Sequence, residues 1–191
     1  IMPDNISMAV LLSGSGRTLQ NFLDLSESGG LKADVGGVLS STSDAYGLQR
    51  AENAGVPSEV VSPEDYEDIS DFSTAITEAL TEWEPDLIAM AGFMFFYEIP
   101  EIFQHKVMNI HPALLPSFGG KGFYGDRVHK AVLEFGCKVS GCTVHFADNI
   151  YDHGPIIVQR AVEVKEEDDV HSLADRVFEQ EKKAYPEAVN L

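Results

Sequence analysis

Three polar side chains with the chemistry of acyl transfer fall within residues 107–155. An apolar run that reads as a strand ends in the letters NIHP, which contain Asn109 and His111, and a later strand pattern leads to an acidic loop with Asp152. Asn109 and His111 are two residues apart, so on an extended backbone their side chains point to the same side. A carboxamide and an imidazole aimed at one oxygen can stabilise the oxyanion formed when a carbonyl is attacked. A carboxylate near His111 would favour the imidazolium form and hold its orientation.

Each of these residues also has an ordinary structural interpretation. Asp152 taken alone is typical of a surface turn, and a lone histidine is usually structural. His145, inside the next strand pattern, either borders a pocket or is a satisfied core histidine. His129 lies in a helical pattern and is expected at the surface or at the edge of a phosphate site rather than in catalysis. The side chains of Asn109, His111 and Asp152 lack metal-ligand spacing on one element, so we predict no metal site.

A glycine-rich turn, SGSGRT at residues 13–18, separates a strand pattern from a helical pattern. Its amide groups could face an anion, and the following helix N-terminus adds partial positive charge. The turn lacks the lysine of a P-loop, and Leu19 stands where a dinucleotide-binding motif needs its third glycine. A phosphate monoester therefore fits better than a triphosphate or a dinucleotide, and a plain tight turn remains the alternative. The candidate phosphate-binding residues are Gly14, Ser15, Gly16, Arg17 and Thr18.

The elements that must position these residues alternate between strand and helix. Hydrophobic patterning predicts strands at 6–12, 33–39, 58–61, 86–91, 106–110, 138–146 and 155–164, and helices after the glycine turn and at 45–54, 72–83, 126–134 and 170–185, with a helical turn at 100–103. Such alternation predicts an α/β fold, a three-layer, mostly parallel twisted sheet with an antiparallel C-terminal strand. In such sheets ligands bind beyond the carboxyl ends of the strands, where the glycine turn, the NIHP segment and the acidic loop all fall. We expect one domain over residues 1–191.

Composition excludes several classes of function. With 44% hydrophobic residues among 191, the chain is expected to form a globular core. A net charge of −18 argues against nucleic acid and anionic membranes as partners. No apolar run is long enough for a membrane span and no secretory pattern is visible, so we expect a cytoplasmic protein. Cys137 and Cys142 do not form a CxxC pattern and are expected to be reduced thiols in or beside a strand.

Five motifs in order resemble phosphoribosylglycinamide formyltransferase, the folate-dependent GAR transformylase family of purine synthesis. They are SGSGRTLQ at 13–20, AGFM at 91–94, NIHPALLPSF at 109–118, SGCTVHF at 140–146 and DHGPIIVQ at 152–159. The resemblance implies a Rossmann-like formyltransferase fold over nearly the whole chain. It also implies transfer of the formyl group of 10-formyltetrahydrofolate, a co-substrate, to the amine of glycinamide ribonucleotide, with no metal.

The resemblance also implies roles for individual residues. His111 would be the catalytic acid, Asn109 the oxyanion donor and Asp152 the partner of His111. The turn around Gly16 would hold the ribonucleotide phosphate, and Glu181 would lie near the glycinamide end. The folate would be lined, largely through backbone groups, by Met94, Phe95, Phe96, Tyr97, Asp148, Asn149, Ile150 and Tyr151. His145 is a further residue that could border the pocket.

The chain departs from the family pattern in ways that concern the folate. Many members have arginine after AGFM, where this chain has Phe95, and an arginine that some members carry in the region of Ile69 is absent. The glutamate tail of the co-substrate is thus expected to be held differently or weakly. Arg17 and Thr18 also replace the residues that often follow the second glycine of the turn.

Three other functions compete with this interpretation. Formyltetrahydrofolate deformylase shares the Asn-x-His core, but its water nucleophile needs no phosphate turn. Methionyl-tRNA formyltransferase shares the core too, but it usually has a basic surface, whereas this chain is acidic. A non-catalytic phosphate- or nucleotide-binding module would have no need of Asn109, His111 and Asp152 together. The expected partners are therefore the two small-molecule substrates, with no nucleic acid and no membrane, in a monomer or a homodimer.

Overall fold

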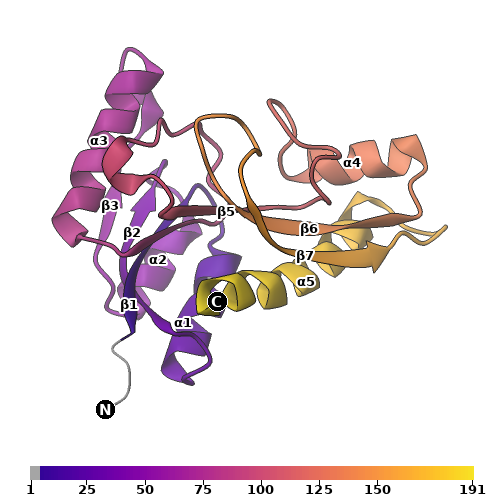
Figure 1. Ribbon diagram of the computed structural model, residues 1–191, viewed down its shortest axis with the longest axis horizontal. Coiled ribbons are helices and arrows are strands. Elements are labelled where there is room, and N and C mark those ends of the chain that lie inside the picture. Colours follow the sequence, from indigo (N-terminus) through magenta and orange to yellow (C-terminus); the bar gives the residue numbers. More distant parts are fainter. Residues whose placement is uncertain (1–4) are drawn as a thin grey trace. The chain divides into compact units, whose positions relative to one another are not determined.

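The computed structural model of the protein describes residues 5–191. Its strands follow the order β3-β2-β1-β4-β5-β6-β7 in a seven-stranded sheet flanked by helices (Figure 1). The strands are β1 Ile6–Leu12, β2 Ala33–Ser40, β3 Ser58–Val60, β4 Leu87–Met90, β5 Val107–His111, β6 Val139–Phe146 and β7 Ile156–Glu163. The helices are α1 Arg17–Glu27, α2 Tyr46–Asn53, α3 Ile69–Trp83, α4 Asp126–Phe135 and α5 Val170–Asn190, with 3-10 turns η1 Pro63–Asp65 and η2 Glu101–Phe103. The predicted α/β class is confirmed.

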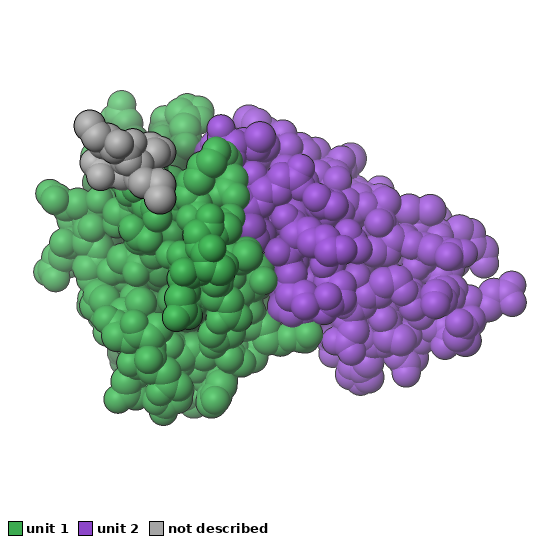
Figure 2. Space-filling model, turned by 90° about the horizontal axis from the view of Figure 1, so that it is seen from below, with its two compact units in different colours: residues 1–108, 190 green, residues 109–189, 191 purple. Residues whose placement is uncertain are grey.

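The chain divides into two compact units, residues 1–108 with 190 and residues 109–189 with 191 (Figure 2). In the first unit β1 pairs in parallel with β2 and with β4, and β2 pairs in parallel with β3. Residues Met8 to Leu12 of β1 have no exposed surface at all. A strand buried on both faces reads as a continuous apolar run, which is why β1 could be recognised from its letters. The prediction of one formyltransferase domain over the chain stays a prediction.

The second unit holds the antiparallel pair of the sheet. β6 pairs antiparallel with β7, as predicted, with a register irregularity between Val144 and His145. Two free thiols belong to this region: Cys142 is buried in β6 and Cys137 lies just before it, as expected. Burial, aided by the nearby charge of Glu181, raises the pKa of the Cys142 thiol to about 12.

Helix α5 extends further than its sequence pattern predicted. The pattern indicated an end at Tyr185, but the helix continues through Pro186 to Asn190. Proline removes one backbone hydrogen bond from a helix interior. Here Ala184, Tyr185, Ala188 and Val189 are all buried, and the burial of this apolar face offsets the loss. At its start, Asp169 and Ser172 form a capping box.

No helix among residues 5–191 is long and apolar enough to cross a lipid bilayer. Within the same part of the chain, no group of three or more His, Cys, Asp or Glu side chains is arranged to hold a metal ion.

Candidate functional site

The side chains of His111 and Asp152 meet in the second unit. The His111 Nδ1 atom lies 3.3 Å from Asp152 Oδ1, and the imidazole is 3% exposed. His111 is the last residue of β5, one position beyond the predicted strand end. Asp152 has a φ of 50°, a left-handed conformation that Asp tolerates better than most residues and that occurs in the loop before β7. The sequence-based expectation that these residues form a pair is therefore matched by their geometry.

Backbone groups of one loop complete the surroundings of this pair. The Nε2 atom of His111 lies 2.8 Å from the Phe118 carbonyl oxygen, and the Gly120 amide donates to Asp152 Oδ2 at 2.8 Å. Both ring nitrogens of His111 thus face oxygen atoms that can accept a hydrogen bond. A Cβ atom at Gly119 would lie 2.5 Å from Leu115 and 3.3 Å from Asp152. Gly119 therefore lets the loop approach the carboxylate closely.

The environment keeps Asp152 ionised. Burial alone would raise its pKa, but the hydrogen bond and charge of His111 and the Gly120 amide together hold the pKa below its ordinary value. A carboxylate in this state can stabilise positive charge on the neighbouring imidazole. The pair therefore offers a proton donor fixed in place by its partner.

Asn109 is held by a histidine in the same unit. Its Nδ2 atom lies 3.2 Å from His145 Nε2, while His145 Nδ1 lies 3.1 Å from the Phe146 carbonyl and 3.0 Å from the His153 carbonyl. His145 is 1% exposed. Of its two interpretations from sequence, His145 is a satisfied buried histidine, and it also contacts a candidate catalytic residue.

Thr143 and Gln159 form hydrogen bonds with the backbone just after His111 that were not predicted from the sequence. Thr143 Oγ1 donates to the Ala113 carbonyl at 2.7 Å and accepts from the Leu115 amide at 3.0 Å. Gln159 Nε2 donates to both Thr143 Oγ1 at 2.9 Å and the Leu115 carbonyl at 3.1 Å. These bonds satisfy backbone groups of the segment that follows His111. Threonine and glutamine in strand patterns carry no signal that would have revealed this role.

His129 corrects an expectation. The sequence placed it at the surface or at a phosphate edge, but it is 4% exposed, on the buried face of α4 with Val128 and Val132. Its Nδ1 atom is buried with no hydrogen-bond partner among the described residues. Burial lowers the pKa of His129, Asp126 opposes the shift and His111 adds to it. The apolar neighbours, one helical turn apart, carry the histidine inward.

The glycine turn belongs to the first unit and is held by an arginine that the sequence analysis missed. Arg50 Nε donates to the Ser15 carbonyl at 2.9 Å, Arg50 Nη1 donates to Gln20 Oε1 at 2.9 Å, and the guanidinium stacks on the Tyr46 ring. Gly16 has a φ of 66°, and a Cβ there would lie 2.7 Å from Gly47. The turn is thus built against α2, and Arg50 brings a cation to its backbone. A lone arginine in a helix pattern gives no sign of such a contact.

The segment expected to line the folate contacts the glycine turn within the same unit. The Met94 amide donates to Ser13 Oγ at 2.9 Å, and the Ser13 amide donates to the Gly92 carbonyl. Met94 and Phe95 are 46% and 41% exposed, while Tyr97 is buried and its hydroxyl lies 2.9 Å from Thr77 Oγ1. Burial raises the pKa of Tyr97 to about 12.

Aromatic rings surround the exposed Phe95. Its ring meets those of Phe72 and Phe93 edge-on, with centroids 6.0 Å and 6.4 Å away. The stretch of sequence that contains Phe95 has no Lys or Arg between Arg50 and Lys106.

The remaining expected residues lie in the second unit. The loop with Asp148, Asn149, Ile150 and Tyr151 precedes Asp152, and Asp148 Oδ1 accepts from the Ile150 amide at 3.0 Å. Glu181 lies on α5, close enough to Cys142 for its charge to affect that thiol. The assignment of Glu181 and of the loop to substrate binding stays a prediction.

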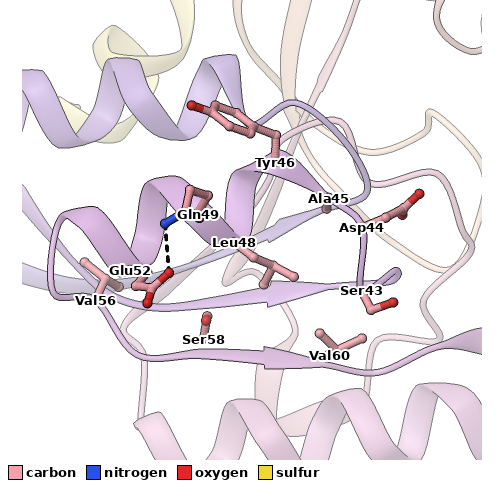
Figure 3. A pocket seen from close by; sticks show the side chains of 10 residues that line it. All are labelled: Ser43, Asp44, Ala45, Tyr46, Leu48, Gln49, Glu52, Val56, Ser58 and Val60. Atoms are coloured by element: carbon pink, nitrogen blue, oxygen red, sulfur yellow. Dashed lines mark hydrogen bonds between the residues drawn. The ribbon is translucent and has the colours of Figure 1, made fainter.

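A separate hollow of about 590 Å³ lies in the first unit, between α2 and β3 (Figure 3). Its lining includes Tyr46, Leu48 and Val60, and the Gln49 side chain donates to Glu52 at 2.8 Å along α2. None of the residues expected in the site lines it, and its lining contains no Lys, Arg or His.

Comparison with known proteins defines the class. The formyl transferase family model matches residues 6–189, so the chain belongs to the formyl transferase family. Among solved structures, it is similar to glycinamide ribonucleotide transformylase 1 from Symbiobacterium toebii, with a TM-score of 0.92 and 41% identity over 100% of this chain and 88% of that one. A phosphoribosylglycinamide formyltransferase from Brucella melitensis has a TM-score of 0.87 and 32% identity, covering 97% of this chain and 94% of the other.

Curated relatives point the same way. The trifunctional purine biosynthetic protein adenosine-3 of Gallus gallus is 39% identical across 100% of this chain, which spans 19% of that relative's length. The chloroplastic phosphoribosylglycinamide formyltransferase of Vigna unguiculata is 37% identical over 95% of this chain and 59% of its own length. The resemblance found in the sequence motifs is confirmed. The existence of a chloroplastic relative leaves the expected cytoplasmic location a prediction.

Proposed function

We propose that this chain transfers the formyl group of 10-formyltetrahydrofolate to the primary amine of glycinamide ribonucleotide. The observation that carries the proposal is the arrangement of Asn109, His111 and Asp152, in which a buried imidazole is paired with an ionised carboxylate and a carboxamide is fixed on the same strand end. The names of the similar proteins supply the acceptor, glycinamide ribonucleotide, and the formyl group that is transferred. The formyl donor is the one that the family resemblance implies.

The chemistry follows from these groups. The amine of the ribonucleotide attacks the formyl carbon, and the carbonyl oxygen becomes an oxyanion. An amide hydrogen of Asn109 and a ring N–H of His111 stabilise that charge. In this structure the Phe118 carbonyl oxygen lies 2.8 Å from His111 Nε2. The proposed reaction requires the formyl oxygen to replace it there when the co-substrate binds. Asp152 stabilises the imidazolium and keeps its ring in position.

Collapse of the tetrahedral intermediate breaks the bond to N10 of the folate. The amine has become cationic and loses one proton, and N10 gains one, so no net acid or base is consumed. Water held beside Asp152 can carry that proton between the two nitrogens. The formyl group ends on the ribonucleotide and tetrahydrofolate leaves.

The glycine turn supports a phosphate-bearing acceptor. Its amides precede the N-terminus of α1, and Arg50 shapes its backbone from α2. A helix N-terminus of this kind favours an anion. A hydrolase that uses water as its nucleophile would have no need of such a cradle.

A single assay distinguishes formyl transfer to the ribonucleotide from hydrolysis by a deformylase and from binding without catalysis. The protein is incubated with 10-formyl-5,8-dideazafolate, and release of the deformylated folate is followed with and without glycinamide ribonucleotide. The proposal predicts release only when the ribonucleotide is present. Release at the same rate without it would indicate a deformylase, and absence of release under both conditions would indicate a binding module.

A further inference from the structure

The tautomer of His145 is fixed by its surroundings. Its Nδ1 atom lies 3.1 Å from the Phe146 carbonyl oxygen and 3.0 Å from the His153 carbonyl oxygen. Carbonyl oxygens only accept hydrogen bonds, so the proton must sit on Nδ1. The Nε2 atom of the neutral ring then carries a lone pair.

This lone pair fixes the orientation of Asn109 in turn. Nε2 of His145 lies 3.2 Å from the Asn109 carboxamide. If the carboxamide oxygen faced Nε2, two acceptors would oppose one another, so the amide nitrogen must face it. One amide hydrogen is then held by His145, and the second is left for another acceptor.

The neutral form of His145 is favoured by its burial. Burial lowers its pKa, and the charge of His111 acts in the same direction, while the carbonyls of Phe146 and His153 and the carboxylate of Asp152 act against the shift. A proton on Nε2 would face the amide hydrogens of Asn109 and turn the carboxamide over.

We propose that His145 is a positioning residue for formyl transfer: its Nε2 atom holds the carboxamide of Asn109 so that the second amide hydrogen points at the developing oxyanion. The inference rests on the proposed function. His145 itself does not touch the reacting atoms. Its contribution is to remove the alternative orientation of Asn109, in which the oxygen rather than the nitrogen would meet the negative charge.

Two substitutions separate this role from a merely structural one. In His145→Gln, the side-chain carbonyl reaches the place of Nε2 and can still accept from Asn109. In His145→Asn, the amide nitrogen takes the place of Nδ1 and can still donate to the carbonyls of Phe146 and His153, but no acceptor remains for Asn109. We expect His145→Gln to keep kcat within about threefold, and His145→Asn to lose about 10- to 100-fold in kcat with little change in either KM.

The relative kcat values of His145→Gln and His145→Asn test the inference. If His145→Asn is active and His145→Gln is impaired, or if both behave alike, His145 does not act through Asn109 and the inference is wrong. A double variant adds a second test. On an Asn109→Ala background, His145→Asn should cause no further loss of kcat, whereas independent losses that multiply would contradict the proposal.

A measurement on the unaltered protein tests the tautomer of His145 without relying on the activity of any variant. Nitrogen-15 NMR of labelled histidine, with the His145 signals assigned by their disappearance in His145→Gln, reports which ring nitrogen carries the proton. The proposal requires the Nδ1–H tautomer at neutral pH, and an Nε2–H tautomer would overturn it. If the unaltered enzyme showed no ribonucleotide-dependent transfer, the proposed function would fail. An active enzyme with a fully active His145→Asn variant would refute the positioning role alone.

Discussion

The imidazole of His111 and the carboxylate of Asp152 lie 3.3 Å apart, and a different backbone group of the loop at residues 118–120 binds each of them. The Asp152 side chain can therefore keep its hydrogen bond to Gly120 even when its charge is removed. This separation of charge from local structure makes Asp152→Asn an informative change.

Asp152→Asn should lower kcat by roughly 10²-fold or more while the protein stays folded. The asparagine oxygen can still accept from Gly120, but it no longer stabilises an imidazolium at His111. Steady-state kinetics with both substrates, together with a thermal melt, measures the two effects. A variant with unaltered kcat would show that the carboxylate has no part in the reaction.

Asn109→Ala should lower kcat by about 10²–10³-fold, the usual cost of losing one oxyanion donor.

His111→Ala should abolish turnover and leave ribonucleotide binding within about tenfold, because His111 does not belong to the glycine turn. Calorimetric titration with the ribonucleotide checks the binding. Full activity in either variant would refute the assigned role.

The glycine turn should control the KM of the ribonucleotide. Arg17→Ala removes a cation from the turn, and Arg50→Gln removes the guanidinium that holds the Ser15 carbonyl. Each should raise the KM for glycinamide ribonucleotide roughly tenfold and leave the KM for the folate unchanged, as expected for a lost charge-assisted contact or a loosened turn. An unchanged ribonucleotide KM in Arg17→Ala would mean that the Arg17 side chain does not contact the phosphate.

Phe95 should make the enzyme indifferent to the glutamate tail of the folate. The ring packs with Phe72 and Phe93, and no Lys or Arg occurs in the sequence between Arg50 and Lys106. We expect mono- and polyglutamylated co-substrates to have KM values within about threefold of each other, since aromatic contacts do not depend on the number of carboxylates. Phe95→Arg should lower the KM of the polyglutamate in low salt. A strong preference of the unaltered protein for polyglutamates would contradict this account.

The start of α5 offers a test of stability away from the site. Asp168 accepts hydrogen bonds from Arg176 Nη1 and Nη2 at 2.6 Å and 2.8 Å and from the Lys165 amide at 2.8 Å. Asp168→Asn should lower the free energy of unfolding by about 1–3 kcal/mol and leave kcat unchanged. Urea denaturation measures the first and the standard assay the second.

The sign of the pH effect follows from the same contacts. The hydrogen bonds from Arg176 hold the pKa of Asp168 below its ordinary value. The stabilisation is therefore fully present above the unfolded pKa of about 3.9 and is lost as the pH falls through the lower folded value. Asp168→Asn should flatten the loss of stability in acid. If the free energies of unfolding of the unaltered protein and of Asp168→Asn fall in parallel below pH 4, the contact between Asp168 and Arg176 is not the cause.

Much of the fold was predictable because its strongest signals are local. β1 is an unbroken apolar run, β5 ends in Asn109 and His111, and the glycine turn separates β1 from α1, so alternation and class could be predicted from the letters. Element ends were less predictable, since burial of Tyr185 and Val189 carries α5 past a proline. Local propensity cannot anticipate such tertiary packing.

The candidate site was predictable only in its chemically distinctive members. Asn109, His111 and Asp152 could be selected because their groups suit one reaction. Arg50 and Gln159 could not, because their roles arise from hydrogen bonds to backbone atoms that are remote in sequence. His145 and His129 illustrate the same limit, since only the packed structure shows what a buried histidine contacts.

The central claim is tested most directly by following the formyl carbon itself. The protein is mixed with co-substrate that carries carbon-13 in the formyl group, and with glycinamide ribonucleotide, and carbon-13 NMR follows the label. The account predicts that the signal moves to the formamide of the ribonucleotide at a rate that depends on the enzyme and is lost in His111→Ala. Label that appears as free formate, or an equal rate of transfer in His111→Ala, would contradict it.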